Sequence, residues 1–491
     1  MSENILVIDE GTTSTRAVLF AASGEALGSC QRPLTQHYPA PGLVEHDAEE
    51  IWNLTLECAR EMVAKAGGAD QIAGIGITNQ RETVVFWDAR TGKPLAPAIV
   101  WQDRRTADRC LALRERGEEP VVQAKTGLLL DPYFSGSKIG WALANWPQLA
   151  EAGAHLRVGT IESYLVFRLT GGVHISDASN ASRTALMAIG SGGWDDGLTD
   201  LFGVPREILP EITDCSGELG NTAAELFGSP IPITGMAGDQ QAATIGQGCF
   251  DIGQTKATFG TGAFVLTQTG TTLRQSKHRL LSTVLYQIKG ERHYALEGSV
   301  FVAGSLVQWL RDDLGLIGSA AETEPLARSV PDNGGVYLVP ALSGLGAPHW
   351  QPNARGMIAG LSFSAKKAHI ARAALEAMAH QIHDLKTAFA ADGADWAALR
   401  IDGGMVANDW MAQDLADILD IDVERPAFIE TTALGAAMLA AVGAGLYLSL
   451  EAATAMRGGV TRFQPAMPDT DRQTRLTGWG DALSRVLAPP S

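Results

Sequence analysis

The chain has 491 residues, of which 45% are hydrophobic and 19% are charged. This composition is typical of a globular protein, and the length exceeds what one hydrophobic core usually serves, so we expect at least two large domains. The formal net charge of −17 argues against nucleic acid and anionic membrane surfaces as partners. The five cysteines are scattered and form neither a zinc motif nor a disulfide framework. Since no signal peptide or transmembrane stretch is recognisable, the sequence predicts a cytoplasmic protein without membrane insertion.

A β-hairpin with an unusual turn is predicted at the start of the chain. Residues 5–8 and 16–20 are mostly apolar runs, and Asp9, Gly11 and three hydroxyl-bearing residues lie between them. A glycine lets the backbone approach a ligand, hydroxyl groups suit phosphate oxygens, and Asp9 is placed to orient a hydrated Mg²⁺. The plainer alternative is a Thr-rich turn that an Asp side chain caps. The three hydroxyl-bearing residues are Thr12, Thr13 and Ser14.

Strand-like and helix-like stretches alternate through the rest of the first half. Residues 51–66 have a helical period, with Asp47 as a candidate N-terminal cap. Residues 72–77 form a short apolar run that is typical of a buried strand. Further strands are predicted at 84–87 and 98–101, and helix-rich sequence covers 103–170.

A second hairpin of the same design lies near the middle of the chain. Residues 256–259 and 264–266 are strand-like and flank a Gly-Thr-Gly turn. Two such hairpins about 250 residues apart indicate two related halves, with a boundary near 246–251. Later elements are a long helix with its core face on 371–389, a strand at 399–401 that enters a Gly-Gly turn, and a helix that Asn408 opens.

Motifs for several common chemistries are missing from the sequence. No GxxxxGK[ST] phosphate loop, GxGxxG dinucleotide loop or HExxH zinc motif occurs. A strand at 231–235 instead runs through small residues into Asp239 and Gln240. A carboxylate at such a strand end can take a proton from an alcohol while the neighbouring amide binds a hydroxyl group. The alternative is an Asp that caps a helix.

These motifs occur together, and in this order, in one protein family. The sequence resembles the FGGY carbohydrate kinases over nearly its whole length, and most closely their glycerol-phosphorylating members. The resemblance implies an α/β fold with two actin-like (RNase H-type) ATPase domains flanking a deep cleft. It also implies an N-terminal domain over 1–248 for glycerol and phosphate, and a C-terminal domain over 249–491 for ATP. The segments that carry the resemblance are 9–16, 78–83, 131–136, 237–241, 260–262, 344–350, 402–404 and 432–437.

The resemblance further implies roles for individual residues. Asp239 is similar to the catalytic general base, and Asp9 is similar to the carboxylate that orients Mg²⁺. The residues similar to phosphate and nucleotide contacts are Thr12, Thr13, Ser14, Arg16, Gly260, Thr261, Gly304, Gln308, Gly404 and Asn408. The residues similar to glycerol contacts are Arg81, Glu82, Trp101, Tyr133, Asp239, Gln240 and Phe264.

The implied activity is that of a kinase with ATP and Mg²⁺ as cofactors. It transfers the γ-phosphoryl group to a terminal hydroxyl of glycerol, which gives sn-glycerol 3-phosphate and ADP in glycerol catabolism. Homodimers or homotetramers are usual among such proteins. The chemistry of the glycerol signature agrees, since Arg81 donates and Glu82 accepts hydrogen bonds from vicinal hydroxyl groups. The plainer alternatives are a surface ion pair for Arg81 and Glu82, and a core position for Trp101.

Three positions depart from the family pattern or bear on regulation. Glu10 stands where the family usually has Gln, and it adds a negative charge near the phosphates unless it points away or pairs with a cation. His349 replaces a common Tyr, and the sequence assigns it no role. Some relatives are inhibited by fructose 1,6-bisphosphate through an Arg-bearing loop, but residues 227–230 contain no arginine, so we expect weak or absent inhibition.

Two other functions compete with the phosphorylation of glycerol. One is an FGGY kinase for another polyol or sugar, such as a ketopentose or an aldonate, which we expect to lack Arg81 and Glu82 in combination with Trp101 and Tyr133. The other is an actin-like scaffold or chaperone ATPase, which needs the two hairpins but no acceptor site at Asp239. Dependence of ATP turnover on an added polyol distinguishes all three.

Overall fold

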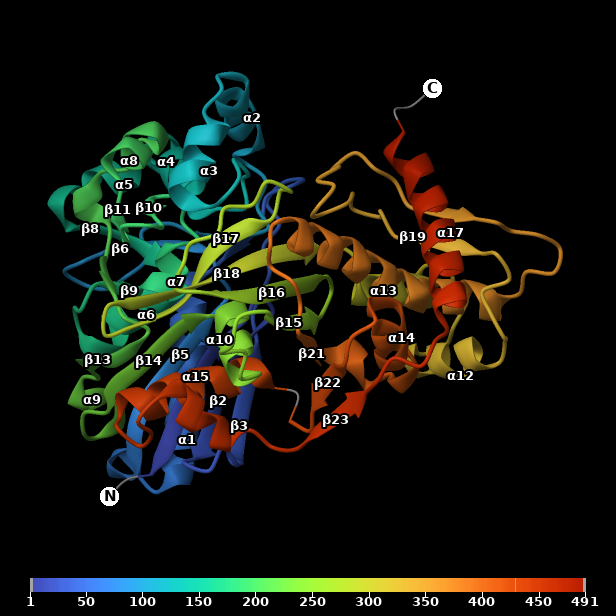
Figure 1. The fold of residues 1–491 in the computed structure, drawn as a ribbon. Coiled ribbons are helices and arrows are strands. Elements are labelled where there is room, and N and C mark those ends of the chain that lie inside the picture. The colour runs from blue at the N-terminus through green and yellow to red at the C-terminus, as the bar shows by residue number, and fades with distance from the viewer. Residues whose placement is uncertain (1–2, 429, 489–491) are drawn as a thin grey trace.

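The computed structural model describes residues 3–428 and 430–488, and two large sheets organise it (Figure 1). The first sheet has the strand order β13-β14-β5-β1-β2-β3, and the second has the order β17-β18-β16-β15-β21-β22-β23. The strands of the first sheet are β1 (Asn4–Glu10), β2 (Ser14–Ala21), β3 (Ala26–Pro33), β5 (Ile72–Asn79), β13 (Ser216–Asn221) and β14 (Pro232–Gly238). Those of the second are β15 (Gln254–Phe259), β16 (Ala263–Gly270), β17 (Leu281–Ile288), β18 (Glu291–Val300), β21 (Ala398–Asp402), β22 (Val423–Pro426) and β23 (Val460–Phe463).

The two sheets share one pattern of strand directions, which confirms the prediction of two related halves. In the first sheet β3, β2 and β1 are antiparallel, β1, β5 and β14 are parallel, and β13 returns antiparallel. In the second sheet β18, β16 and β15 are antiparallel, β15, β21 and β22 are parallel, and β23 returns antiparallel. Both predicted hairpins are therefore present, and each lies at the centre of its sheet. The α/β fold of two related domains is the one expected.

Most other predicted elements lie where the sequence indicated. The first helix is α1 (Ala48–Ala66), and Asp47 caps it by accepting a hydrogen bond from the Glu49 backbone N–H at 2.8 Å. Asn408 caps α14 (Asp409–Leu419) by accepting from the Met411 N–H at 2.9 Å. The predicted strand at 98–101 is shorter, since β7 covers only Ala98–Ile99.

A smaller sheet and a mainly helical insertion extend the first half, and apart from the strand at 45–46, which precedes β5, they lie between β5 and β13 in the chain. The smaller sheet has the order β4-β7-β6-β8. Its other strands are β4 (Glu45–His46), β6 (Val84–Asp88) and β8 (Leu156–Thr160). The helices of the insertion are α2 (Ala107–Glu115), α3 (Glu119–Thr126), α4 (Ser135–Asn145), α5 (Pro147–Glu151), α6 (Ile161–Thr170), α7 (Ala178–Ala181) and α8 (Asp196–Phe202), and α9 (Ala224–Phe227) follows β13.

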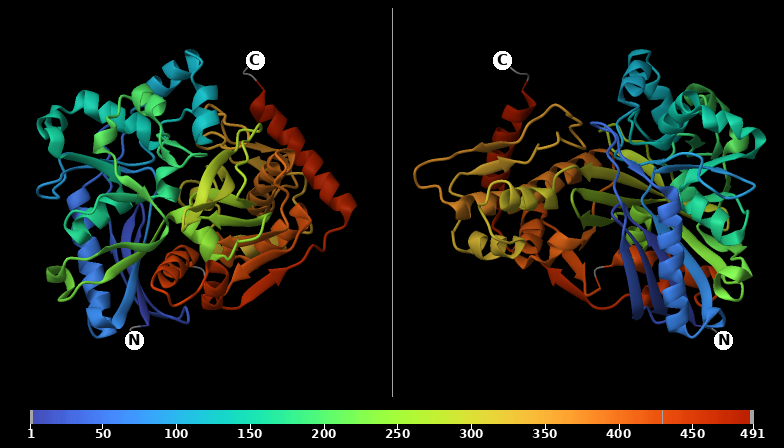
Figure 2. Two further views of the ribbon diagram at one scale, coloured as in Figure 1. Left: turned by 60° about the vertical axis from the view of Figure 1, so that its left-hand side comes forward. Right: turned by 180° about the vertical axis from the view of Figure 1, so that it is seen from behind.

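Two helices, α10 (Asp239–Gly246) and α15 (Thr431–Gly443), join the halves. Helix α10 follows β14, and α15 follows β22 and packs on β14, β5 and β1 of the first sheet. A Cβ on Gly76 would lie 2.4 Å from the Ala436 carbonyl oxygen, and one on Gly435 would lie 1.8 Å from the Ala242 carbonyl oxygen. These glycines are needed because α15 presses its backbone against both β5 and α10. In Figure 2 the blue-to-green half and the yellow-to-red half lie side by side in both views.

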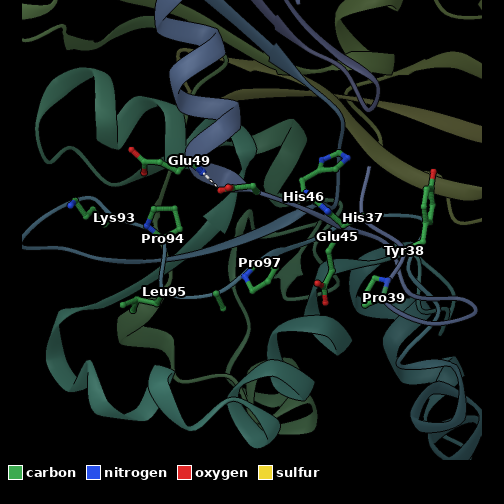
Figure 3. A pocket seen from close by; sticks show the side chains of 12 residues that line it. His37, Tyr38, Pro39, Glu45, His46, Glu49, Lys93, Pro94, Leu95 and Pro97 are labelled. Atoms are coloured by element: carbon green, nitrogen blue, oxygen red, sulfur yellow. Dashed lines mark hydrogen bonds between the residues drawn. The ribbon is translucent and has the colours of Figure 1, made fainter. Parts of the chain in front are cut away.

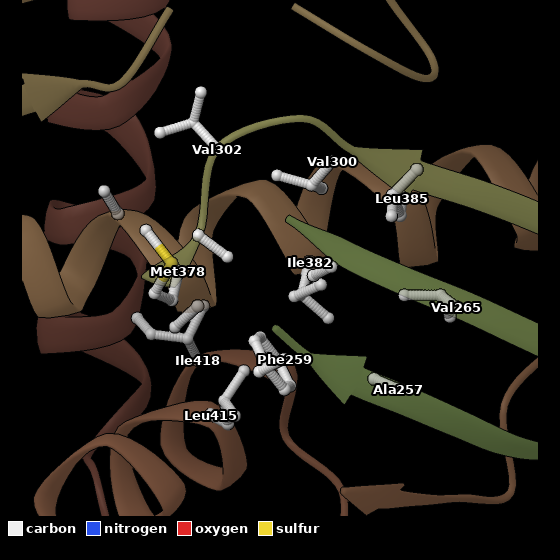
Figure 4. Packing of buried hydrophobic residues seen from close by; sticks show 14 of the residues in the cluster. Ala257, Phe259, Val265, Val300, Val302, Met378, Ile382, Leu385, Leu415 and Ile418 are labelled. Atoms are coloured by element: carbon white, nitrogen blue, oxygen red, sulfur yellow. The ribbon is translucent and has the colours of Figure 1, made fainter. Parts of the chain in front are cut away.

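The core of the second half lies between its sheet and two long helices (Figure 4). Phe259 and Val265 from the sheet pack with Met378 and Ile382 of α13 (Lys367–Ala391) and with Leu415 of α14. All five side chains are fully or almost fully buried. The helical period predicted for 371–389 therefore marks a real core face. The remaining helices of this half are α11 (Gly304–Asp312), α12 (Thr323–Arg328), α16 (Leu450–Ala453) and α17 (Asp469–Leu487), and its remaining strands are β19 (Tyr337–Val339) and β20 (Met357–Ala359).

Candidate functional site

A chain of five charged side chains runs through the centre of the molecule. Arg81 Nε lies 3.1 Å from Asp239 Oδ1, and the two terminal nitrogens of Arg81 lie 2.6 and 3.2 Å from the carboxylate of Glu297. Arg183 continues the chain, with Nη2 3.0 Å from Glu297 Oε1 and Nε 2.7 Å from Glu82 Oε1. Four of the five are at most 3% exposed, and only Asp239 is reachable from solvent, with 34% of its side chain exposed. Charged side chains that are buried so close together are stable only when they are paired, and such a buried network is typical of a functional site.

Arg81 and Glu82 lie directly after β5, at the carboxyl end of the parallel strands. Glu82 has a φ of +64°, which turns the chain sharply into β6. Gly238, at the end of the neighbouring β14, makes room for Arg81, since a Cβ there would lie 2.7 Å from Arg81 Cδ. The alternative of a surface ion pair is therefore wrong, because both side chains are buried.

Asp239 and Gln240 open α10, as the sequence placed them at a strand end. Gly238 is the capping position and Asp239 the first helical residue, so the N-cap alternative is also wrong. The Gln240 backbone N–H donates to Asp239 Oδ1 at 2.7 Å. The amide oxygen of Gln240 accepts from Lys256 Nζ at 2.5 Å, and its Nε2 donates to Asp239 Oδ2 at 3.3 Å. The carboxylate is thus fixed from one side while its exposed side remains open.

Aromatic residues connect this charged chain to the first turn. Trp101 is only partly buried, and its Nε1 donates to Thr12 Oγ1 at 2.9 Å. Its ring meets that of Tyr133 edge to face, 5.6 Å between centroids, and the Tyr133 hydroxyl lies 3.5 Å from Arg81 Nη2. Phe264, the second residue of β16, is partly buried and follows the Gly260–Gly262 turn. Trp101 is therefore not a plain core residue.

The first turn carries an ion pair that reaches the other half. Arg16 Nη2 lies 2.5 Å from Asp9 Oδ2, and Arg16 Nη1 lies 2.6 Å from Glu430, just before α15. Burial raises the pKa of Asp9, Arg16 opposes this, and the negative charges of Glu430 and Asp239 add to the rise. Asp9 and Asp239 therefore share one electrostatic environment. Thr13 and Ser14 complete the turn, where Gln31 donates to Ser14 Oγ at 2.8 Å.

Glu10 points away from this turn. Its carboxylate accepts hydrogen bonds from Thr15 Oγ1 at 2.7 Å and from Thr55 Oγ1 at 3.0 Å, inside the first half. Burial raises the pKa of Glu10 well above its ordinary value. The extra negative charge expected from the sequence is thus removed from the phosphate side.

The positions predicted for the nucleotide gather around the second turn. The Gly304 N–H donates to the Gly260 carbonyl oxygen at 2.9 Å, and the Ser305 N–H donates to that of Thr261 at 3.2 Å. A Cβ on Gly304 would lie 3.5 Å from Met405 Cγ, which places the segment after β21 beside them. Gly260, Thr261, Gln308 and Gly404 are exposed, so the surface they form is open. Asn408 lies at the edge of this group, where its Nδ2 donates to Thr323 Oγ1 at 3.2 Å.

Three charged residues of the site have no motif in the sequence. Arg183, Lys256 and Glu297 are each 0% exposed and contact predicted site residues directly. Burial raises the pKa of Glu297, but Arg183 and Arg81 outweigh it and lower the pKa to about 2. Burial lowers the pKa of Lys256 to about 8, with the nearby Asp402 and Asp239 opposing. For Lys256 and Glu297 the available signal is a charged residue within a strand of mostly buried residues, and Arg183, which follows α7, carries no such signal.

Two further features lie apart from this site. A groove of about 910 Å³ between the segments 37–49 and 93–97 is lined by described residues that include none of the predicted site residues (Figure 3). His349, which the sequence left unassigned, lies 3.6 Å from Asp384 in the second half, beside Trp479. Neither feature contacts the charged chain.

Oxygen donors for a metal ion are few at the site. Among residues 3–428 and 430–488, no group of three or more His, Cys, Asp and Glu side chains has a metal-binding arrangement. Asp9 nevertheless fits the role predicted for it, because Mg²⁺ in kinases takes one or two carboxylates and completes its shell with water and phosphate oxygens. Within the same described part of the chain, no helix has the length and apolar character needed to cross a membrane.

Comparisons with known proteins place the chain in one family. The N-terminal domain of the FGGY family of carbohydrate kinases matches residues 4–246, and the C-terminal domain of that family matches residues 255–444. A glycerol kinase of Rhodospirillum centenum is 54% identical over 487 residues, 98% of each chain. One of Gluconobacter oxydans is 53% identical, over 99% of this chain and 96% of the relative.

A solved structure shows the same arrangement. The glycerol kinase of Plasmodium falciparum, crystallised with ADP, superposes with a TM-score of 0.94 at 36% identity and covers 99% of both chains. Both halves, their order and the connection between them are therefore shared. The chain belongs to the FGGY family of carbohydrate kinases.

Proposed function

We propose that this chain acts as a glycerol kinase, which transfers the γ-phosphoryl group of ATP to a terminal hydroxyl of glycerol. The observation that carries the proposal is the buried Arg81 beside the half-open carboxylate of Asp239, 3.1 Å apart. Full-length relatives at more than 50% identity that are glycerol kinases support the choice of substrate. Sugar kinases share the fold, so the polyol pocket decides between them.

The proposed pocket holds a small polyol through hydrogen-bond donors and acceptors. Arg81 and the Gln240 amide donate to hydroxyl oxygens, Glu82 and Tyr133 line the same side, and Asp239 accepts. Trp101 and Phe264 give the carbon chain an apolar wall. Asp239 takes the proton of the terminal hydroxyl as that oxygen attacks phosphorus, which is general base catalysis within a reaction dominated by positioning and charge.

The proposed nucleotide site uses the two turns. Thr12, Thr13, Ser14 and Arg16 face the phosphates from the first half, and Gly260 and Thr261 face them from the second. Gln308, Gly304, Gly404 and Asn408 form the open surface for the rest of the nucleotide. Asp9 would hold Mg²⁺, and the ion would supply charge neutralisation for the phosphates. The proposal thus includes ATP and Mg²⁺ as cofactors.

The roles of the two domains, the localisation and the oligomeric state are part of the same proposal. Residues 1–248 bind glycerol and phosphate, and residues 249–491 bind ATP. The protein works in the cytoplasm as a homodimer or homotetramer. The charge of −17 supports partners other than nucleic acid.

ADP release tests the proposed function. The purified chain is given Mg·ATP with glycerol, dihydroxyacetone, xylulose, gluconate or no acceptor. The fastest release with glycerol is expected. Fastest release with a sugar would retain the kinase chemistry and overturn the glycerol pocket, and release independent of any acceptor would overturn the kinase function itself.

A further inference from the structure

One face of the second sheet points at the polyol pocket of the first half. In the ladder Lys256 lies opposite Leu266, Leu266 lies opposite Glu297, and Phe264 lies opposite Ser299. Residues opposite each other, and alternate residues along a strand, share a face of a sheet. The core that Leu266 shares with Ala237 and Ala242, before and in α10, shows that this face looks toward the first half.

Glu297 binds two arginines of the first half at once. Its carboxylate takes both terminal nitrogens of Arg81, at 2.6 and 3.2 Å, in the fork geometry that is strongest for this pair. Oε1 also accepts from Arg183 Nη2 at 3.0 Å. Arg183 is held as well by Glu82, and its guanidinium carbon lies 5.3 Å from the Phe134 ring centroid. All four charged residues are at most 3% exposed, so Glu297 is a buried counter-charge that fixes both arginines.

Lys256 fixes the orientation of the Gln240 amide. Lys256 Nζ is a donor without acceptor capacity, so the atom of Gln240 that meets it at 2.5 Å is the oxygen. The amide nitrogen therefore faces Asp239 and the pocket. Gln240 presents donors to a hydroxyl oxygen there, as Arg81 does.

Resting on the proposed glycerol kinase function, we propose that Glu297 and Lys256 are positioning residues for glycerol, supplied to the pocket by the nucleotide-binding half. They touch no substrate and act through Arg81 and Gln240. The polyol site is thereby incomplete without the second sheet, which links glycerol affinity to the contact between the halves.

The charge of Glu297 determines where the Arg81 side chain points. Glu297 carries a full negative charge at every physiological pH, since Arg183 and Arg81 lower its pKa to about 2 against the opposing effect of burial. Without that charge, the carboxylate nearest to Arg81 is that of Asp239 at 3.1 Å, since the carboxylate of Glu82 lies 4.0 Å away. Arg81 is then drawn onto the carboxylate that has to accept the proton, and its donors turn away from glycerol.

The variant Glu297→Gln tests the proposal because it keeps the shape and removes the charge. We expect the Kd and the KM for glycerol to rise by roughly ten- to a hundredfold, the range of one lost charged hydrogen bond. The Kd for ADP, measured by calorimetry without glycerol, stays unchanged. Glu297→Asp, which keeps the charge on a shorter side chain, recovers part of the glycerol affinity. A merely structural role would move both ligands and the melting temperature together.

Glu376→Gln is the matched control. Glu376 is also a buried carboxylate of the second half, 1% exposed, and lies 2.8 Å from Arg372 and 3.7 Å from Arg475. Its loss affects stability without a selective change in glycerol affinity. Lys256→Met is the second test, with the same expected selectivity, and it decides alone if Glu297→Gln does not fold.

The outcomes separate this inference from the proposed function. Wild-type ADP release that does not depend on glycerol overturns the function. Glycerol-dependent wild-type activity, together with unchanged glycerol affinity in Glu297→Gln or in Lys256→Met, overturns the positioning role and leaves the function standing.

Discussion

The two halves differ most in the loops that follow their equivalent central strands. After β5 come Arg81 and Glu82, which are charged, long and at most 3% exposed. After β21 come Gly403 and Gly404, and a Cβ on Gly404 would meet no atom within 4 Å. The loop after the central strand thus carries buried charges in the first half and exposed glycine backbone in the second half. Under the proposed function, the buried charges recognise the small polyol and the open backbone leaves room for the larger nucleotide.

The acidic residues at the two crossing helices make a second contrast. Asp239 opens α10 and pairs with Arg81, while Glu430 precedes α15 and pairs with Arg16. The Glu430 side chain is 45% exposed, and its arginine is 19% exposed, so this pair is weak. The pair in the first half is shielded from water on the arginine side. Acidic residues at similar positions of the two helices therefore form ion pairs of different strength.

The largest expected effect on turnover comes from replacing one of these two acidic residues, Asp239, and the replacement of Glu430 is its control. Asp239→Asn should lower turnover by roughly 10²–10⁴, because the general base is lost, and it should retain glycerol binding. Glu430→Gln removes one exposed ion pair, and we expect turnover within a few-fold of wild type. Single-turnover kinetics and glycerol calorimetry measure both. Near-normal turnover in Asp239→Asn would remove Asp239 from the role of base.

An intermediate effect is expected from filling the open surface of the second half. Gly404→Leu places a side chain where the nucleotide is proposed to lie, so the KM for ATP should rise about tenfold at unchanged glycerol KM. Stability should not change, since that space is empty of protein atoms. Gly458→Leu, at another position open to a Cβ, is the control. Equal KM for ATP in both variants would contradict the proposed nucleotide surface.

Acid sensitivity compares one buried histidine in each half. Burial lowers the pKa of His46 to about 4, and burial lowers that of His380 well below its usual range. The unfolded chain binds a proton at each below pH 6.5 and the folded chain does not, so stability is present above pH 6.5 and falls as pH drops toward 4. His46 accounts for about 2 kcal/mol of the loss between pH 7 and pH 5.

Urea unfolding of His46→Gln at pH 7 and pH 5 measures this contribution. The variant is less stable at pH 7 but should lose less on acidification than the wild type. An identical loss in both proteins would show that His46 does not titrate in this range.

The smallest expected effect on the rate is that of fructose 1,6-bisphosphate. We expect millimolar fructose 1,6-bisphosphate to leave the rate unchanged, because residues 227–230 offer no arginine and Ser229 Oγ is bound to Asp70 at 2.8 Å. Rates at saturating and at limiting glycerol, with and without the bisphosphate, check this. Clear inhibition would mean that cations from other elements serve this loop.

Local patterns predicted the scaffold well, and the reasons are physical. Each hairpin combines two apolar runs with a glycine turn, and Asp47 and Asn408 are caps whose position the following helical period reveals. The glycine at position 76 is visible in the sequence but its purpose is not, because α15 reaches β5 from more than 350 residues away.

The site was predictable only where a residue type repeats a family motif. Arg81, Trp101, Tyr133 and Asp239 are indeed connected, and their roles stay predictions. Glu297 could not be found, because its partners Arg81 and Arg183 are 216 and 114 residues away in the chain. The inward direction of the Glu10 side chain could not be predicted either, since Thr55, which donates to its carboxylate, comes from a separate helix.

The position of α15 means that neither half is a folding unit in itself. Ile5 and Val7 of β1, Leu266 of the second sheet and Leu439 of α15 share one fully buried cluster. If the chain were cut at the connection near residue 250, α15 and the first sheet would lie on different fragments. Each would then expose the apolar surface that it buries against the other. Two such fragments would be recovered in soluble form only when they are produced together, so an insertion or fusion that keeps activity belongs at a surface loop and not at the apparent midpoint of the chain.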